Sequence, residues 1–156
     1  MGRRGLAAAG TVGVLLLAGA GCGEEEGVAD GAEVTAYVAA PLCAGAESEL
    51  ARSGGRTGSV RIRAVCLPEV RTAGGIDLAA VGANARRASE DSTAVGYLEQ
   101  PGPATRFSGP ILESAGIAQI TAGSGAAAMA RLLGAVREAG DAASMREGVA
   151  DALGGP

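Results

Sequence analysis

The 156-residue chain has no histidine, lysine or tryptophan, so all 13 of its basic side chains belong to arginine. Without histidine, the commonest zinc sites, Ser-His-Asp and Cys-His catalysis, and proton transfer by imidazole are excluded. Aromatic residues are equally scarce, since Tyr37, Tyr97 and Phe107 are the only three, which disfavours base stacking and aromatic-cage recognition. A formal net charge of −4 also lacks the basic surface that nucleic-acid binding needs.

What the chain does contain is an ample supply of small and medium apolar residues. They make up 47% of the sequence, so a core must be built mainly from Ala, Val, Leu and Ile. The length suits one domain at most. No two carboxylates are brought together by the pattern, and we expect a non-enzymatic protein without metal or cofactor.

The first 21 residues have the features of a signal peptide. Arg3 and Arg4 precede an apolar run over residues 6–20 that is short for a membrane span. The small residues before Cys22 resemble the lipobox of bacterial lipoproteins, in which the cysteine becomes the lipidated first residue. Gly19 departs from that pattern, which prefers Leu or Val there. An ordinary A-x-A cleavage site at residues 18–20 is the alternative, and it would leave Cys22 as a spare thiol.

Residues 22–33 follow as an acidic, glycine-interrupted segment without an apolar face. From Cys22 onward, 11 arginines stand against 17 acidic side chains, a net charge of −6. This composition predicts a flexible tether that holds the following domain, residues 34–156, away from the membrane.

Two further cysteines, Cys43 and Cys66, lie 23 positions apart. With Cys22 lipidated, their even number in an oxidising compartment favours a disulfide. The alternative to a disulfide is that both cysteines are small buried residues with free thiols. A catalytic cysteine is disfavoured because no histidine is present to activate it.

Four apolar runs have the composition of strands, and they span residues 34–40, 60–67, 93–98 and 118–122. The second begins with strict alternation, which indicates one wet face near a sheet edge. Five helical segments alternate with the strands or follow them, over residues 44–52, 77–91, 103–116, 125–140 and 144–153.

Helical spacing assigns inward faces to these segments. In the second helix, it places Leu78 inside with three other apolar residues, and Asn84 on the opposite side with Arg86 and Arg87. In the third helix, it places Phe107 inside. The fourth helix has a strong apolar face, formed by Met129, Leu132, Leu133 and Val136.

The resulting order, βαβαβαβαα, predicts the α/β class. We expect a doubly wound parallel sheet of about four strands, in the order 2-1-3-4, with helices on both faces and right-handed crossovers.

Three stretches of this pattern resemble a known family. They read VTAYVAAPL, DLAAVGANARRASEDSTAVGYLEQ and GPATRFSGPILESAGIAQITAGSG. Together they are similar to the amino-terminal lobe of type I periplasmic binding proteins, the leucine/isoleucine/valine-binding receptors of ABC importers. The segments AAAMARLLGAVREAG and MREGVADAL resemble the carboxy-terminal helices of that family. The resemblance implies a single-lobe derivative in which the second lobe is missing near residue 125.

The resemblance also implies a ligand crevice at the carboxyl ends of the strands, within residues 41–46, 99–105 and 123–125. Gly102 falls where a ligand-binding Ser is usual and Gly125 where a Thr is usual, so both hydroxyls are missing. Candidate ligand contacts are then the backbone N–H groups of Gly102, Ala104 and Ser124, with the hydroxyls of Thr105 and Ser124.

Simpler explanations compete at each of these positions. Thr105 and Ser124 suit helix caps, and Glu99 suits a solvated loop acid. Residues 123–128 superficially fit a dinucleotide fingerprint. The nearest downstream acid, Asp141, lies beyond the helix rather than after a following strand, so we do not expect nucleotide binding.

Two functions follow as hypotheses for a lipid-anchored protein on the extracytoplasmic face of the cell membrane. The first is a solute-binding module for amino acids or similar small polar molecules, linked to an ABC permease. Binding would be weak, because one lobe offers only one wall of a cleft. The second is an envelope interaction lipoprotein that uses the exposed cleft face for a protein partner or as a homodimer.

Overall fold

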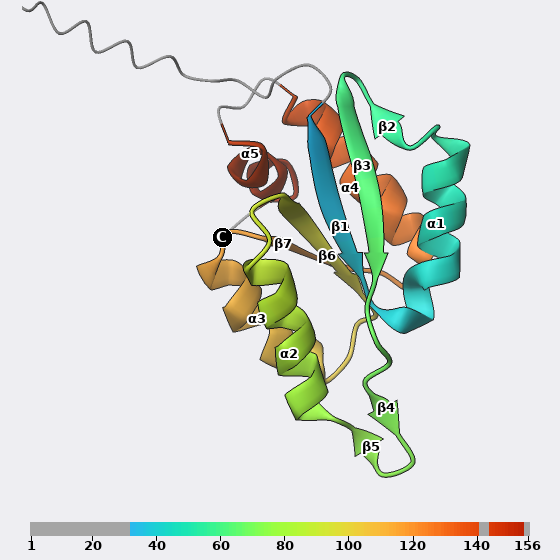
Figure 1. The fold of residues 1–156 in the computed structure, drawn as a ribbon, viewed down its shortest axis with the longest axis vertical. Helices are drawn as coiled ribbons and strands as arrows, with labels where there is room; N and C mark the ends of the chain where they lie inside the picture. The colour runs from blue at the N-terminus through green and yellow to red at the C-terminus, as the bar shows by residue number, and fades with distance from the viewer. Residues whose placement is uncertain (1–31, 141–143, 155–156) are drawn as a thin grey trace, which may run out of the picture.

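The computed structural model of the protein describes residues 32–140 and 144–154. The predicted signal peptide, the lipidation site at Cys22 and nearly all of the predicted tether lie outside the described residues. The elements are β1 (Glu33–Val38), the 3-10 turn η1 (Ala40–Leu42), α1 (Cys43–Arg52), β2 (Arg56–Thr57), β3 (Val60–Cys66), β4 (Arg71–Thr72), β5 (Gly75–Ile76), α2 (Leu78–Ser89), β6 (Ala94–Glu99), α3 (Thr105–Ser114), β7 (Ala118–Thr121), α4 (Gly125–Glu138) and α5 (Met145–Ala152) (Figure 1).

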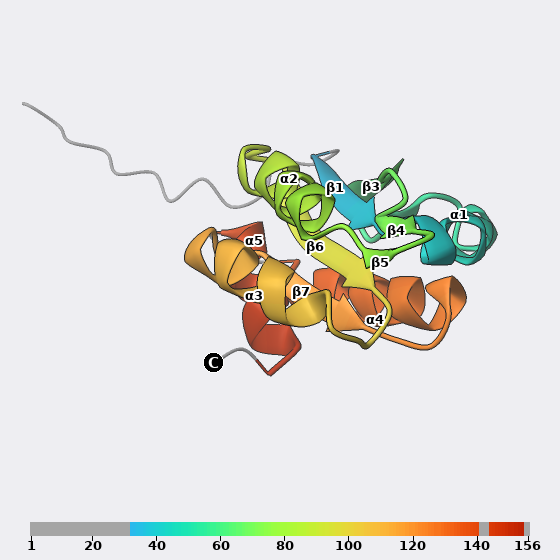
Figure 2. The same ribbon diagram turned by 90° about the horizontal axis from the view of Figure 1, so that it is seen from below.

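The main sheet has five strands in the order β2-β3-β1-β6-β7. β1 lies at its centre and pairs in parallel with β3 on one side and β6 on the other, and β7 is parallel to β6. The predicted α/β class is confirmed, as is the order 2-1-3-4 of the four longer strands. Helices pack on both faces of the sheet (Figure 2).

The prediction of an all-parallel sheet was wrong at one edge, where β2 runs antiparallel to β3. Only two residues, Gly58 and Ser59, connect them, and Gly58 has a φ of +56°. Such a two-residue connection with a positive φ closes a tight hairpin. A second short hairpin, β4–β5, projects separately beyond the carboxyl ends of the strands (Figure 1).

The helices divide between the two faces. α1 and α4 cover one face and contact each other closely, and α5 packs against α4 on the same side. α2 and α3 cover the opposite face (Figure 2). Within the described residues, no helix combines the length and apolar composition needed to cross a membrane.

The predicted inward faces are confirmed for α4 but wrong at three positions of α2 and α3. Leu78 and Phe107 are 46% and 48% exposed, because both lie in the first turn of a helix that begins past the end of the sheet. Asn84 is buried instead of exposed, because its side-chain amide donates to the Pro68 carbonyl at 3.1 Å. A satisfied polar side chain can occupy an inward position that hydrophobic periodicity alone does not assign to it.

The disulfide between Cys43 and Cys66 is present in the structure. Their Cα atoms lie 5.8 Å apart, within the range that a disulfide spans. Cys43 opens α1 and Cys66 ends β3, so the bond joins two segments that both leave the carboxyl end of the sheet.

Candidate functional site

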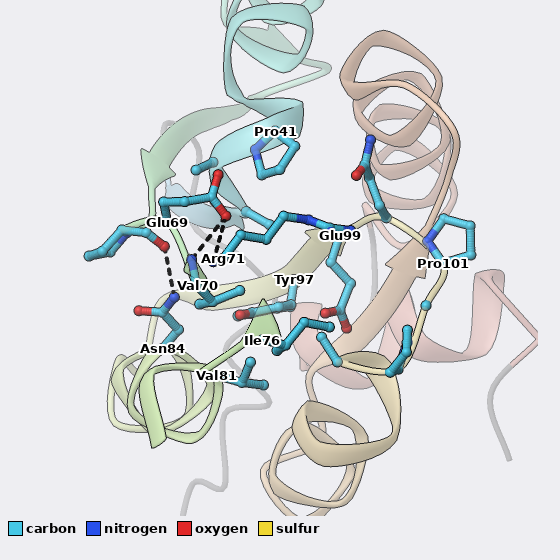
Figure 3. Close-up of a pocket in the computed structure, with 17 residues that line it drawn as sticks. Pro41, Glu69, Val70, Arg71, Ile76, Val81, Asn84, Tyr97, Glu99 and Pro101 are labelled. Carbon is cyan, nitrogen blue, oxygen red and sulfur yellow. Dashed lines mark hydrogen bonds between the residues drawn. The ribbon is translucent and has the colours of Figure 1, made fainter. Parts of the chain in front are cut away.

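A pocket opens at the carboxyl ends of β3, β1 and β6 (Figure 3). The chain moves from β1 to β3 on one side and later places β6 on the other, so the strand order reverses between β1 and β6. Ligands of doubly wound sheets bind at such a reversal. The volume of the pocket is about 60 Å3, enough for a few water molecules or a small polar group.

Three segments that follow strands form most of the wall: residues 39–41, 68–71 and 99–104. Pro41, Pro68, Pro101 and Pro103 lie within them, and each proline fixes its φ and lacks an N–H that a further strand would need. The β4–β5 hairpin closes one side through Arg71 and Ile76. The rim is therefore built from stiff turns attached to parallel strands.

Tyr97 supplies a polar atom that opens into this pocket. The residue is only 3% exposed, and no described residue forms a hydrogen bond with its hydroxyl. Within the described ranges, every fully buried side-chain nitrogen or oxygen atom has a hydrogen-bond partner. The Tyr97 hydroxyl therefore keeps contact with solvent, and the pocket that Tyr97 lines is where it does so. Burial, and to a lesser extent the Glu99 carboxylate, raise the pKa of Tyr97, so the group stays a neutral hydroxyl.

Asn84 lines the pocket beside Pro68. Its amide nitrogen is engaged by Pro68, whereas its oxygen has no hydrogen-bond donor among the described residues and is not closed off from solvent. Figure 3 shows Asn84 and Glu69 on one side of the pocket and Pro101 on the other, with Tyr97 between them.

Arg71 and Glu69 give the rim its charge. The Glu69 carboxylate accepts the backbone N–H groups of Val70 and Arg71, both at 3.0 Å, which fixes the turn into β4. The Arg71 guanidinium forms no salt bridge with a described residue and lines the pocket. It is thus a cation at the rim that remains available to an anionic group.

Glu99 is buried, and the prediction that it is a solvated loop acid was wrong. It is 4% exposed, and its carboxylate accepts hydrogen bonds from the Ser108 hydroxyl at 2.7 Å and the Gln119 amide. Burial raises the pKa of Glu99, and the bonds from Ser108 and Gln119 offset part of that rise. Both bonds tie the start of the 99–104 wall to α3 and β7, so Glu99 positions the pocket wall.

The four predicted ligand residues separate into two pairs. Gly102 and Ala104 line the pocket. The Thr105 hydroxyl instead donates to the Gly102 carbonyl at 2.7 Å, and Ser124 caps α4 by accepting the Ala127 N–H at 3.2 Å. The competing interpretation as a helix cap is confirmed for Ser124 but wrong for Thr105, which is the first residue of α3 and follows its cap, Ala104. Neither hydroxyl reaches the pocket.

Gly125 has a packing role. A Cβ atom at this position would collide with the Leu42 carbonyl and the Ala46 backbone N, because the start of α4 crosses η1 and α1 at very close range. No Thr fits there in this structure, so close packing accounts for the glycine at this position. Gly102, in contrast, has open space around it, and a Ser could be accommodated.

Tyr97, Asn84 and Arg71 were not predicted from the sequence to line the pocket. Tyr97 lies two positions before Glu99 on β6, so the two side chains share a face of the sheet. Arg71 reaches the pocket through a hairpin of two-residue strands, which is too short to leave a periodic pattern.

Comparisons with family models, with curated proteins and with solved structures found no match to this chain.

Proposed function

We propose that the protein is a non-enzymatic solute-binding domain for amino acids or similar small polar molecules. The observation that carries the proposal is the pocket at the strand-order reversal, into which the Tyr97 hydroxyl opens without a partner among the described residues. A ligand that hydrogen-bonds this hydroxyl would replace the solvent that contacts it.

The chemistry of the lining suits a zwitterion. The Arg71 guanidinium and the Tyr97 hydroxyl offer donors to a carboxylate. The Glu69 carboxylate offers an acceptor to an ammonium group. Glu69 and Arg71 are exposed at the rim and Tyr97 lies deeper, so the charged groups of the ligand would stay near solvent.

Binding is expected to be weak. A pocket of about 60 Å3 is far smaller than the roughly 300–1,000 Å3 that encloses most small ligands. The single-lobe derivative of a binding-protein fold that the sequence motifs suggest would explain this size, because the second wall of the cleft belongs to the missing lobe. We further propose that the chain is anchored by lipid at Cys22 on the extracytoplasmic face, where an ABC permease would be its partner.

Calorimetry with leucine, isoleucine, valine and polar amino acids on the full chain, purified in detergent, tests the proposal. We expect dissociation constants in the millimolar range. Gly102→Ser places a hydroxyl in the pocket wall and should tighten binding about tenfold, the effect of one added hydrogen bond to a charged ligand.

Gly123→Ser is the matched control, because Gly123 also has open space around it but does not line the pocket. It should leave affinity unchanged. Micromolar affinity of the wild-type monomer would refute the proposal that one wall of the cleft is missing. No binding by either the wild type or Gly102→Ser would reject solute binding.

One observation favours the envelope interaction protein as a second candidate. Leu78 and Phe107, the large hydrophobic side chains that are exposed among the described residues, both lie in first helical turns at the carboxyl end of the sheet. Exposed apolar groups near a pocket rim suit a protein partner or a second copy. Sedimentation equilibrium decides this point: a dimer that Phe107→Ser dissociates would identify self-association through this end.

A further inference from the structure

A second hollow lies at the open edge of the sheet, away from the pocket. It has a volume of about 520 Å3 and lies between α3 and α5, with the start of β7 as its floor. β7 is the last strand of the sheet and pairs only with β6 within the described residues. Small residues keep the hollow open: Gly109, Gly116, Ala150 and Gly154.

The backbone of β7 presents hydrogen-bonding groups to this groove. The Ala122 N–H donates to the Glu99 carbonyl at 3.2 Å, so residues 118, 120 and 122 face β6, and residues 117, 119 and 121 face outward. The Ile117 N–H donates to the Leu112 carbonyl, and the Arg131 guanidinium donates to the Thr121 carbonyl. The Ile117 carbonyl, both Gln119 backbone groups and the Thr121 N–H have no partner among the described residues.

The groove is negatively charged. Glu113, Glu147 and Asp151 line it, and no arginine does. None of the three forms an ion pair within the described ranges. Their carboxylates are also too far apart to hold one metal ion, since the three-ligand group found among the described residues is Cys43, Glu47 and Cys66, whose two cysteines are joined in the disulfide. The charge is spread along the groove, which suits an extended cationic ligand.

We propose that the β7 groove binds an extended, positively charged peptide segment of a partner protein, which adds a strand to the sheet beside β7. Backbone hydrogen bonds to residues 117–121 would supply affinity, and basic side chains pointing alternately toward α3 and α5 would meet Glu113 on one side and Glu147 and Asp151 on the other. The floor and both walls of such a strand site are present in the described structure.

The negative charge of the β7 groove disfavours two other occupants, a second copy of this chain and its own amino-terminal segment. A second copy paired through β7 would bring both sets of three carboxylates together, which is repulsive. The amino-terminal segment of this chain carries Glu24, Glu25, Glu26 and Asp30, so its sign is also wrong for the groove.

Fluorescence anisotropy with the full chain in detergent provides the test. The probe is a labelled ten-residue peptide in which pairs of arginines alternate with pairs of valines, so that arginines point to both faces of the added strand. We expect micromolar binding of this peptide, and at least tenfold weaker binding when four consecutive central residues are N-methylated, because they can then no longer pair with a strand. The same peptide with glutamate in place of every arginine should not bind. Amide hydrogen exchange in residues 117–122 should slow when the basic peptide is added.

Variants locate the site. Glu113→Gln with Asp151→Asn should weaken binding several-fold, whereas Glu138→Gln, an exposed acid of α4 that does not line the groove, should not. Thr121→Pro removes one outward N–H at an edge position that tolerates proline and should also weaken binding. Equal affinity for the N-methylated peptide, or unchanged exchange in residues 117–122, would overturn the proposal, as would a β7-mediated dimer.

Discussion

The two faces of the sheet are packed in different ways. The face under α1, α4 and α5 is a continuous apolar cluster that includes Leu98, Ile120, Met129 and Leu132. The face under α2 and α3 has a smaller cluster and also holds buried polar groups and the pocket. The dense face is therefore expected to provide most of the stability, and the looser face to provide the polar atoms and open space that a ligand needs.

Truncating one leucine on each face tests this comparison most directly. Leu132 and Leu112 are both fully buried, one in each cluster. Leu132→Ala should lower the free energy of unfolding by about 4 kcal/mol and Leu112→Ala by about 2–3 kcal/mol, because the looser face can collapse around the cavity. Urea unfolding measures both. An equal or reversed order would show that the two faces contribute alike.

Removing the disulfide should have the next largest effect. Cys43→Ser with Cys66→Ser releases a loop with a sequence separation of 23 residues, which corresponds to roughly 3–4 kcal/mol of lost stability in the chain-entropy model. Urea unfolding of the oxidised wild type and the double variant measures the difference. The reduced wild type is the control and should match the variant. Unchanged stability in both would mean that the bond adds no constraint.

The pH dependence of stability should reveal Glu99 on the looser face. Because its pKa is raised above the ordinary 4.5, the native state binds more protons than the unfolded state just above that value. Stability therefore falls as pH rises from 4.5 through the raised pKa. Glu99→Gln should remove this fall and unfold at higher urea than the wild type at pH 7.

Asp91 provides a comparison, because its pKa is shifted in the direction opposite to that of Glu99. Burial pushes its pKa up, but hydrogen bonds from Thr93 and Tyr37 and the charge of Arg63 outweigh burial and leave the pKa below 3.8. Its contribution is present above pH 3.8 and is lost as pH falls through the lowered pKa. Asp91→Asn should remove the loss of stability at acidic pH and leave the fall in stability above pH 4.5 unchanged. The Glu99 interpretation fails if Glu99→Gln has the pH profile of the wild type.

The smallest change in stability is expected for Tyr97→Phe. Its hydroxyl has no partner in residues 32–140 and 144–154, so the free energy of unfolding should shift by less than about 0.5 kcal/mol, while amino-acid affinity falls about two- to tenfold through one lost hydrogen bond. Tyr37→Phe on the same face is the control, because Tyr37 donates to Asp91 at 3.0 Å. It should cost about 1 kcal/mol without changing affinity. The reverse pattern would place the ligand elsewhere.

The longer strands and the helices could be predicted because apolar runs mark the strands and helical spacing marks the helices, and the strand order followed from the doubly wound topology that their alternation implies. β2 and the β4–β5 hairpin could not be predicted from periodicity, because strands of two residues contain no repeat. The Gly58-Ser59 turn was the available signal for β2.

The candidate site was only partly predictable, because its polar residues depend on tertiary partners. Glu99 is held by Ser108 and Gln119, which lie 9 and 20 positions away, and no local pattern pairs them. The location of the pocket followed from topology alone, and Gly102 and Ala104 lie in its wall as expected. The exclusion of Thr105 and Ser124 depended on local backbone bonds that compete for their hydroxyls.

Strand polarity has a consequence for a chain held by its amino terminus. β1 begins at Glu33, and the pocket lies past its other end, where the β4–β5 hairpin projects (Figure 1). Glu33 is 11 positions after Cys22, a distance of at most about 40 Å. Under the proposed anchoring, the domain would be attached to the bilayer at the amino ends of its parallel strands, at the end of the domain opposite its pocket. A permease at the membrane would then have to receive solutes from the end of the domain that lies farthest from the attachment point.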